Sequence, residues 1–298
     1  MPNPWSARLE TRDGCRSVKG CLNRAECTTV LSMAFYDWFG FAIDCTLEEG
    51  VPVVDSNDVD YQMKMARNHI AAFLEGTDPG FREIYESVKA FSMCPVERLY
   101  DLHKAVRYVD AAGIPGDIVE VGVWRGGALA MAALSSPRGG RMFVGFDTFS
   151  GHLEPRNDEV DIWGNDLHER WRVETGDGAS AWAPASTAEV LDAFDGLGID
   201  ASQVELIEGD VKETVETWPD REIAILRIDC DWYPESLAAL QGLYPYLVQG
   251  GVLICDDYGH HSGQRRAVDE FFAGQAIRFS HIDYSCITST RLDTPVRS

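Results

Sequence analysis

Apolar runs with the pattern of β-strands alternate with segments of helical periodicity along the second half of this chain. The strand-like runs lie at 117–121, 141–146, 203–207, 223–228 and 251–255, and two terminal ones follow near 277–281 and 285–291. Helical segments separate the earlier runs near 127–135, 186–197, 234–247 and 263–273. Such alternation is typical of a mostly parallel sheet with helices on both faces. We therefore predict an α/β fold whose sheet has seven strands.

The chain before this alternation has a different organisation. Residues 1–28 are polar and show no sustained periodicity, which predicts an N-terminal tail. Between 29 and 112, apolar residues recur every three or four positions, and this spacing predicts a helical cap region. The most regular stretches of that region are 61–74, 81–91 and 96–109. The main domain is predicted over 113–298.

One connection within the main domain, 152–184, is unusually long. It is acidic and contains Trp163, Trp171 and Trp182. A connection of this length in a compact domain is usually either a functional lid or a disordered insert. The three tryptophans favour a lid.

Charge and composition limit the partners of the chain. Lys and Arg number 26 against 48 Asp and Glu, so the formal net charge is −22. A surface this acidic repels a phosphate backbone and an anionic membrane, which excludes nucleic acid as a favoured partner.

Other features bear on location and assembly. The apolar stretch 30–47 is too short and too charged to span a bilayer, and the N-terminus shows no secretory signal. Cys230 and Cys255 lie inside apolar runs, as reduced core thiols do. We therefore expect a cytoplasmic protein. Residues 33–43 would expose a large aromatic surface unless they pack on the domain or on a second subunit, so we also expect a homo-oligomer.

The turn after the first strand has the composition of a ligand-binding turn. Glu120, Gly122, Trp124 and Gly126 lie in the sequence Glu-Val-Gly-Val-Trp-Arg-Gly-Gly. Its glycines let the backbone pass close to a ligand, and the helix that follows offers free N–H groups. The turn lacks the Gly-x-Gly-x-x-Gly of dinucleotide enzymes. It suits S-adenosylmethionine, whose positive sulfonium tolerates acidic neighbours.

Acidic residues also end the second and third strands. Asp147 follows the second strand, where a carboxylate would hold a ribose diol. Gly209 and Asp210 follow the third strand, where the acid could accept a hydrogen bond from an adenine amino group. A helix cap or a loop carboxylate is the alternative for each acid. Together they favour a ligand that contains a nucleoside.

Four carboxylates follow the fourth and fifth strands: Asp229, Asp231, Asp256 and Asp257. If these strands are neighbours, the four groups repel strongly in a cleft unless they are protonated or bridged by a cation. Oxygen ligands without a Cys pair or a His cluster point to Mg²⁺ or a similar hard ion. Capping of the following helices could explain one acid at each strand end.

Three segments, 113–127, 226–236 and 243–271, resemble the macrocin and mycinamicin O-methyltransferases. Their motifs include Leu-Arg-Ile-Asp-Cys-Asp-Trp-Tyr-Pro-Glu-Ser and Gly-Gly-Val-Leu-Ile-Cys-Asp-Asp-Tyr-Gly-His, and the resemblance covers about 93–273. It implies the Rossmann-like fold of class I S-adenosylmethionine-dependent methyltransferases. It also implies Mg²⁺-dependent O-methylation, commonly of a sugar hydroxyl on a natural product.

The resemblance also implies roles for single residues. The metal ligands would fall on Asp229, Asp256 and Asp257. The general base would fall on Asp231, with His260 as its rival. The sequence leaves open which of Asp229 and Asp231 binds the metal and which accepts the proton.

Two other functions are consistent with the same residues. A catechol or other phenolic O-methyltransferase would share the sheet, the metal and the carboxylates, and would differ mainly in its acceptor. A non-catalytic protein could use the fold to bind a nucleoside or a metal. Intact acids at every expected strand end argue against that function. We therefore predict an enzyme that methylates a hydroxyl of a small glycosylated acceptor.

Overall fold

The structure is a computed structural model that describes residues 56–137, 139–175 and 182–292, with side chains described from residue 64 onward. It divides into two compact units. One contains Met1–Arg82 and Met93–Val96, and the other contains Glu83–Ser92 and Glu97–Ser298. The predicted tail 1–28 and the aromatic stretch 33–43 lie outside the described residues.

Among the residues that the structure describes, three α-helices precede the sheet, close to the stretches that the periodicity predicts. They are α2 (Ser56–Glu75), α3 (Pro79–Val88) and α4 (Val96–Ala112), and the short 3₁₀ helix η2 (Lys89–Phe91) extends α3. The α4 helix buries Leu99, Leu102, Val106 and Val109. Their spacing of three and four residues places them on one face, which packs in the core.

The sheet contains seven strands in the order β3-β2-β1-β4-β5-β7-β6. The bounds are β1 Asp117–Val121, β2 Phe143–Asp147, β3 Val204–Glu208, β4 Ile223–Ile228, β5 Leu247–Cys255, β6 Ser280–His281 and β7 Ile287–Thr290. The first five strands pair in parallel, whereas β7 runs antiparallel to both β5 and β6. This confirms the predicted seven-stranded, mostly parallel sheet.

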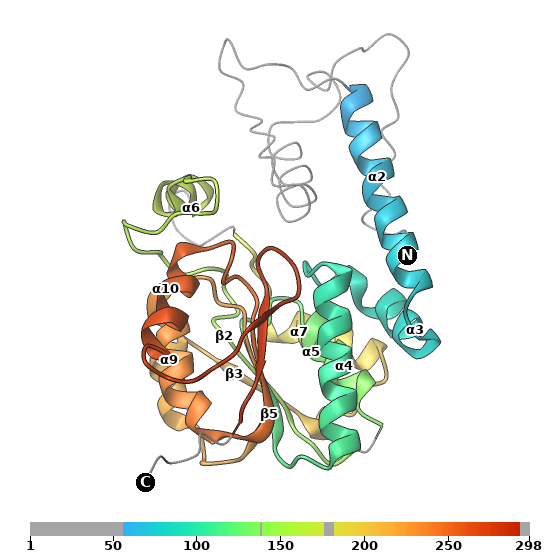
Figure 1. The fold of residues 1–298 in the computed structure, drawn as a ribbon, viewed down its shortest axis with the longest axis vertical. Helices are drawn as coiled ribbons and strands as arrows, with labels where there is room; N and C mark the ends of the chain where they lie inside the picture. Colours follow the sequence, from blue (N-terminus) through green and yellow to red (C-terminus); the bar gives the residue numbers. More distant parts are fainter. Residues whose placement is uncertain (1–55, 138, 176–181, 293–298) are drawn as a thin grey trace. The chain divides into compact units, whose positions relative to one another are not determined.

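Helices cover both faces of this sheet (Figure 1). The helices α9 (Tyr233–Leu243) and α10 (Ser262–Phe271) lie on one side, and α4 and α5 (Gly127–Ser135) lie on the other. Two further helices are α7 (Thr187–Gly196) and the single turn α8 (Val211–Thr214). Every residue of β4 is buried, as expected for a central parallel strand covered on both faces.

Local sequence explains some of the helix boundaries. Ser186 and Glu189 form a capping box at the start of α7, and Pro234 occupies the first turn of α9. The α9 helix ends at Leu243, earlier than predicted, because the chain tightens into the 3₁₀ helix η5 (Tyr244–Tyr246). Strand β5 begins at Leu247, earlier than predicted, and its register against β4 is irregular between Leu247 and Val252, where its paired glycines lie.

The long connection 152–184 contains a helix that the sequence analysis did not predict, α6 (Leu167–Thr175). Two isolated bridges order the segment before it, Val160 with Asp166 and Asp161 with His261. Among the described helices, none has the length and apolar character needed to cross a membrane.

Candidate active site

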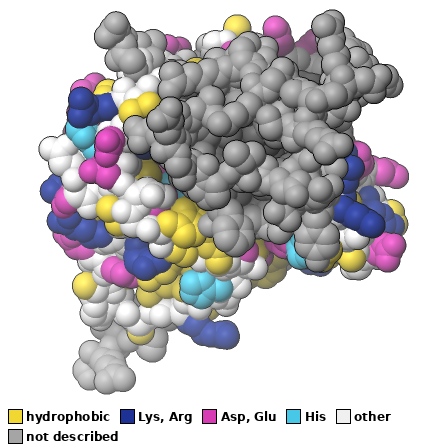
Figure 2. Space-filling view, turned by 90° about the horizontal axis from the view of Figure 1, so that it is seen from above, with side chains coloured by type: hydrophobic (Ala, Val, Ile, Leu, Met, Phe, Trp, Pro, Cys, Tyr) yellow, Lys and Arg dark blue, Asp and Glu magenta, His cyan; other side chains and the backbone are white. Residues whose placement is uncertain are grey.

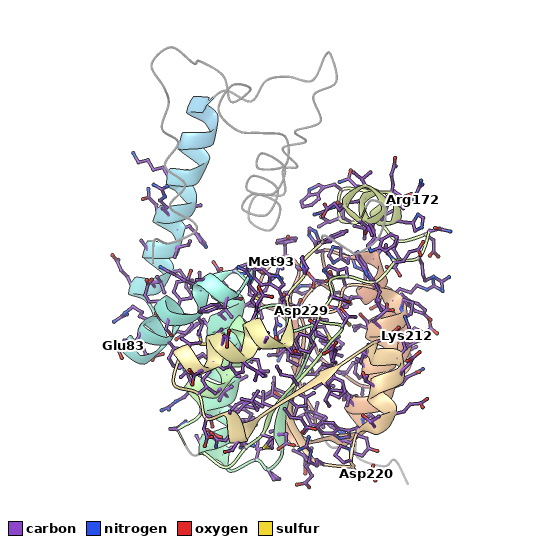
Figure 3. The ribbon with its side chains drawn as sticks, turned by 180° about the vertical axis from the view of Figure 1, so that it is seen from behind. Glu83, Met93, Arg172, Lys212, Asp220 and Asp229 are labelled. Atoms are coloured by element: carbon purple, nitrogen blue, oxygen red, sulfur yellow. The ribbon has the colours of Figure 1, made fainter. Side chains whose placement is uncertain are left out.

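Strand register explains why acidic side chains meet at one edge of the sheet. Ile228, the last residue of β4, pairs with Cys255, the last residue of β5. The next residues along the chain, Asp229 and Asp256, therefore emerge side by side at the carboxyl ends of neighbouring parallel strands. In Figure 3, Asp229 lies at this end of the sheet and Asp220, which precedes β4, lies at the opposite end.

The turn after β1 passes very close to the end of β4. Gly122 has φ +90°, and a Cβ atom there would lie 1.9 Å from the carbonyl oxygen of Asp229. Only glycine fits both this conformation and this approach. The turn leads into α5, whose N-cap Gly126 supplies no side-chain hydrogen bond to the first turn. The backbone N–H groups in the first turn of α5 therefore suit a polar group of a ligand. Trp124 lies in the same turn, with the Arg125 guanidinium 5.3 Å from its ring centroid.

Asp147, the predicted ribose-binding residue, fastens this turn to β2. Its Oδ2 accepts hydrogen bonds from the backbone N–H groups of Val123 (2.7 Å) and Trp124 (2.9 Å). Its Oδ1 accepts a third from the N–H of Phe149 at 2.8 Å. These contacts match the loop-carboxylate alternative that the sequence left open for Asp147. The ribose contact stays a prediction.

The other predicted cofactor-binding acids also have protein partners. Glu120 is buried in β1 and forms an ion pair with Arg227, and burial raises its pKa to about 8. Asp210 caps α8 by accepting a hydrogen bond from the Lys212 N–H, and it lies 3.0 Å from Lys212 Nζ. Gly209 precedes it with φ +137°.

Two buried arginines lie among the carboxylates, and sequence reasoning missed both. Arg227 of β4 lies 2.8 Å from Asp229 and 2.6 Å from Asp256. Arg98 of α4 pairs with Asp256 and lies 2.7 Å from Asp283. The two oxygens of Asp256 are each held by one arginine. The sequence did offer one signal for Arg227, because it is the single charged residue in the apolar run of β4.

The arginines do not balance the acids. Within the described part of the chain, these two guanidinium groups face five carboxylates, those of Glu120, Asp229, Asp256, Asp257 and Asp283. Burial, followed by the charge of Asp231, raises the pKa of Asp257 well above its usual range. Burial also raises the pKa of Asp229 to about 6. Burial favours the protonated form of Asp256 too, but Arg227 and Arg98 outweigh it and lower its pKa. Repulsion among the carboxylates contributes to the raised pKa of Asp257, and a bound cation would relieve that repulsion.

Asp231 is flanked by two histidines that the sequence analysis did not assign to the site. His152 Nε2 lies 3.3 Å from its Oδ2, and His261 Nδ1 lies 3.3 Å from its Oδ1. Burial would raise the pKa of Asp231, but His261 and His152 outweigh it and place that pKa below its usual range. Ligand atoms of Asp231, Asp257 and His261 all lie within 4.8 Å of one another.

This grouping differs from the predicted metal set of Asp229, Asp256 and Asp257. Asp257 belongs to both sets, and the structure places Asp231 beside it. Two carboxylates with excess negative charge around them suit a hard divalent ion. The carboxylate oxygens therefore fit a magnesium ion, whereas His261 in the same group and His152 beside Asp231 are histidines that the sequence argument for magnesium did not include. The identity of the metal and its ligands stay a prediction.

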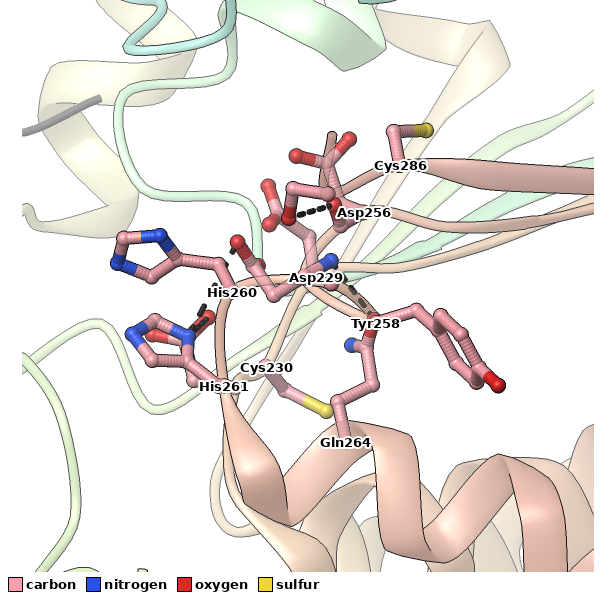
Figure 4. Close-up of polar contacts among 12 residues, drawn as sticks. Asp229, Cys230, Asp256, Tyr258, His260, His261, Gln264 and Cys286 are labelled. Atoms are coloured by element: carbon pink, nitrogen blue, oxygen red, sulfur yellow. Dashed lines mark hydrogen bonds and ion pairs between the residues drawn. The ribbon is translucent and has the colours of Figure 1, made fainter. Parts of the chain in front are cut away.

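His260, the predicted rival base, is buried next to this group. Its ring lies edge-on to that of His261, with centroids 4.5 Å apart (Figure 4). Burial lowers the pKa of His260 to about 3, so the imidazole is neutral near pH 7. Its Nδ1 lies 3.0 Å from the Tyr284 hydroxyl.

The described part of the predicted lid contacts the histidines through aromatic rings. Trp163 packs edge-on to His260 at 5.1 Å, and Trp182 packs edge-on to His152 at 5.2 Å. The indole N–H of Trp171 donates to the His152 carbonyl at 3.0 Å. All three tryptophans of this connection therefore lie near the site or the segment that leads into it.

The strand order, the glycine turn after β1 and the acidic strand ends define a class I O-methyltransferase, an enzyme that uses S-adenosylmethionine. Residues 60–290 match the family described as Macrocin-O-methyltransferase (TylF), and the chain belongs to this family.

Named relatives and solved structures agree with this assignment. The chain is 34% identical over 195 residues to the Mycinamicin III 3''-O-methyltransferase of Micromonospora griseorubida, covering 63% of this chain and 72% of the relative. It is 34% identical over 173 residues to the 8-demethyl-8-(2,3-dimethoxy-alpha-L-rhamnosyl)-tetracenomycin-C 4'-O-methyltransferase of Streptomyces olivaceus. That match covers 57% of this chain and 63% of the relative, which is less than two thirds of its length. The O-methyltransferase NovP has a TM-score of 0.59 and 29% identity, covering 68% of this chain and 82% of its own.

Proposed function

We propose that this protein is a magnesium-dependent O-methyltransferase that transfers the methyl group of S-adenosylmethionine to a sugar hydroxyl of a glycosylated natural product. The observation that carries the proposal is the buried pair Asp231 and Asp257 beside His261, at the edge of the sheet where the glycine turn lies. The names of the mycinamicin and tetracenomycin relatives support a glycosylated acceptor.

The methyl donor would bind at the turn after β1. S-adenosylmethionine carries its methyl group on a positively charged sulfonium. When the methyl group is transferred, the rest of the donor leaves as a neutral thioether. Gly122 and Gly126 let the backbone approach the donor, and Asp147 holds the turn in place. Asp147 accepts one hydrogen bond at Oδ1, which leaves a lone pair for a ribose hydroxyl. Asp210, at the end of β3, is proposed to face the adenine.

The acceptor hydroxyl would meet the carboxylates after β4 and β5. Asp231 and Asp257 are proposed to hold Mg²⁺, which lowers the pKa of a hydroxyl bound to it. The Asp229 side chain is 25% exposed, so it can reach the acceptor, and we assign it the hydroxyl proton. Asp256, held by Arg98 and Arg227, keeps the two arginines in position.

Metal dependence is tested by methyl transfer to demethylated glycosides with Mg²⁺ and with EDTA. We expect transfer to stop in EDTA and to resume when Mg²⁺ is added in excess. Asp257→Asn is expected to lower turnover by at least about 100-fold, more than the loss of an outer partner of a metal site causes. S-adenosylmethionine binding by calorimetry should change little. Asp192→Asn, an exposed carboxylate on α7, is the control. Full turnover in EDTA would exclude the metal.

The acceptor class is tested in the same assay with catechols and other phenols beside the glycosides. Transfer to a sugar hydroxyl supports the proposal. Transfer to catechols alone would assign the alternative acceptor class.

We also propose a cytoplasmic location and a homo-oligomeric state. The described cysteines Cys230, Cys255 and Cys286 form no disulfide, which suits a reducing compartment. Light scattering of the full chain tests the oligomeric state.

A further inference from the structure

Asp231 has an unusual backbone conformation for a residue with a side chain. Its φ is +62°, in the left-handed region, which Asp tolerates better than most residues but at a cost relative to glycine. The N–H of Trp232 donates to the Cys230 carbonyl at 2.6 Å, which closes a three-residue turn centred on Asp231. Such a turn with a positive φ at its centre is rare and strained. A strained residue keeps its conformation only when the surrounding structure holds it.

The long connection after β2 supplies contacts that hold the end of this turn. The indole N–H of Trp232 donates to the Leu153 carbonyl at 3.0 Å. The backbone N–H of Tyr233 donates to Glu159 Oε1, also at 3.0 Å. The two residues that follow Asp231 are therefore both bonded to one segment of the connection.

Glu159 is built into its position between the beginnings of α9 and α10. It is 3% exposed. A Cβ atom on Gly263, in the first turn of α10, would lie 2.7 Å from Glu159 Oε2 and 2.6 Å from the Tyr233 nitrogen, so glycine leaves the room that the carboxylate occupies. The next residue, Val160, exchanges two hydrogen bonds with Ser262, the first residue of α10. The Val160 N–H donates to Ser262 Oγ at 2.8 Å, and the Ser262 N–H donates to the Val160 carbonyl at 3.0 Å.

The start of α9 depends on this partner from elsewhere in the chain. Its N-cap residue, Trp232, supplies no side-chain hydrogen bond to the turn that follows. The first N–H groups of a helix have no partner within the helix, and a carboxylate at this end also interacts favourably with the helix dipole. Glu159 accepts from the first of these groups, the N–H of Tyr233. A residue of the connection therefore performs the capping task that the local sequence does not.

The exposed contacts of the same segment are weaker candidates for holding the turn. Arg156 and Arg266 pair with Asp158 at 3.1 and 3.3 Å, but these side chains are between 47% and 58% exposed. Basic and acidic side chains are interspersed on the side of the molecule where α6 and α10 lie (Figure 2, left). Exposed ion pairs contribute little because solvent screens them. The buried hydrogen bond of Glu159 is therefore the contact whose loss should matter most.

We propose that Glu159 is a positioning residue for Asp231. It holds the first N–H of α9, two residues after Asp231, and so keeps the strained turn closed. The Asp231 carboxylate then stays within reach of Asp257 and His261. The proposal rests on the proposed function, in which Asp231 is a metal ligand. Glu159 acts through the backbone and is assigned no contact with the metal or the substrate.

Mg²⁺ binding measured by calorimetry tests this role. Glu159→Ala removes the acceptor, and we expect the Kd for Mg²⁺ to rise about tenfold, as it does when a metal ligand loses an outer partner. The Kd for S-adenosylmethionine should change little, because the proposed donor site is at the turn after β1, which Asp147 holds. Glu159→Gln keeps an acceptor oxygen for the Tyr233 N–H and should bind Mg²⁺ like wild type. An equal loss in Glu159→Gln would overturn the hydrogen-bond role.

Ser186→Ala is the matched control, because it removes the N-cap of a different helix. The Ser186 side chain accepts a hydrogen bond from the Glu189 N–H at the start of α7. Its loss should lower the stability and leave the Kd for Mg²⁺ unchanged. Equal increases of this Kd in Ser186→Ala and Glu159→Ala would reveal general destabilisation and overturn the proposal. An unchanged Kd in Glu159→Ala would overturn it too.

Hydrogen exchange of the Tyr233 amide separates failure of this role from failure of the proposed function. Glu159→Ala should open this amide to water and speed its exchange at least about tenfold, whereas Glu159→Gln and Ser186→Ala should not. If wild type binds no Mg²⁺ and transfers no methyl group, the proposed function fails and the exchange rate decides alone. Faster exchange in Glu159→Ala only would then show that Glu159 holds the turn. An unchanged rate overturns the role, whatever the enzyme methylates.

Discussion

Replacing Asp147 by alanine tests whether one carboxylate holds the donor-binding turn. The change removes the acceptor of three backbone hydrogen bonds, from Val123, Trp124 and Phe149. A hydrogen bond to a charged group contributes about 1.5–3 kcal/mol when its loss leaves a buried partner unsatisfied. Trp124 is partly exposed, so water can replace one of the three bonds. We therefore expect the free energy of unfolding to fall by about 3 kcal/mol.

The assay combines urea denaturation with calorimetric titration of S-adenosylmethionine. Asp147→Ala should lower the unfolding midpoint without changing the slope, and should raise the donor Kd at least about tenfold because the turn is no longer held. Asp147→Asn keeps one carbonyl oxygen as an acceptor, so its free energy of unfolding should fall by less than half as much as that of Asp147→Ala. Asp192→Ala is the surface control. A raised donor Kd with an unchanged free energy of unfolding would refute the turn-holding role and leave only a ribose contact.

Three further outcomes are expected. Arg227→Met leaves the surrounding buried carboxylates without their cation, and should lower the free energy of unfolding by about 3–5 kcal/mol in urea titration. Burial raises the pKa of Glu159 to about 7, above its ordinary 4.5, so wild-type stability should fall as pH rises from about 4.5 to 7. Glu159→Gln, which cannot ionise, should be more stable than wild type by up to about 3 kcal/mol at pH 8 and similar to it at pH 4, by thermal melting. Asp231→Asn should weaken Mg²⁺ binding in calorimetry, whereas Asp229→Asn should lower kcat and retain the metal.

For each of these three predictions, one experimental result would contradict it. Equal stability of the Arg227→Met variant would mean that the carboxylates are neutral in the folded protein. Parallel pH profiles of wild type and Glu159→Gln would remove the burial argument for Glu159. Loss of Mg²⁺ binding by Asp229→Asn, with retention by Asp231→Asn, would reverse the two roles.

The fold follows from the sequence because burial on both sides of a sheet leaves a visible pattern. The run Ile-Ala-Ile-Leu-Arg-Ile of β4 is buried at every position, so its residue types alone indicate a central strand. The acids after β4 and β5 were predictable for a related reason. Parallel neighbours end at the same edge, and the predicted strand ends, Ile228 and Cys255, are paired.

The charge balance of the site could not be predicted in the same way. Arg98 and Asp256 are separated by 158 residues, and no local pattern connects them. Asp147 was predicted to face a ribose, with a loop carboxylate as the alternative, and the sequence could not show that its oxygens hold the turn after β1. The pairing of His152 with Asp231 likewise depends on the path of a long connection. These contacts are set by tertiary packing, which periodicity does not encode.

The two ion pairs of Arg98 affect the order in which the chain can fold during its synthesis. This arginine joins α4, near the start of the sheet domain, to Asp256 and to Asp283, which is 185 residues away in sequence. Contacts of such high contact order form late, since a long loop must close first. During synthesis, a nascent chain that has emerged only to residue 275 already contains every carboxylate proposed to act in catalysis. It lacks Asp283, so Arg98 has only part of its final environment. We therefore expect activity to appear only after the last two strands have emerged from the ribosome and closed the sheet.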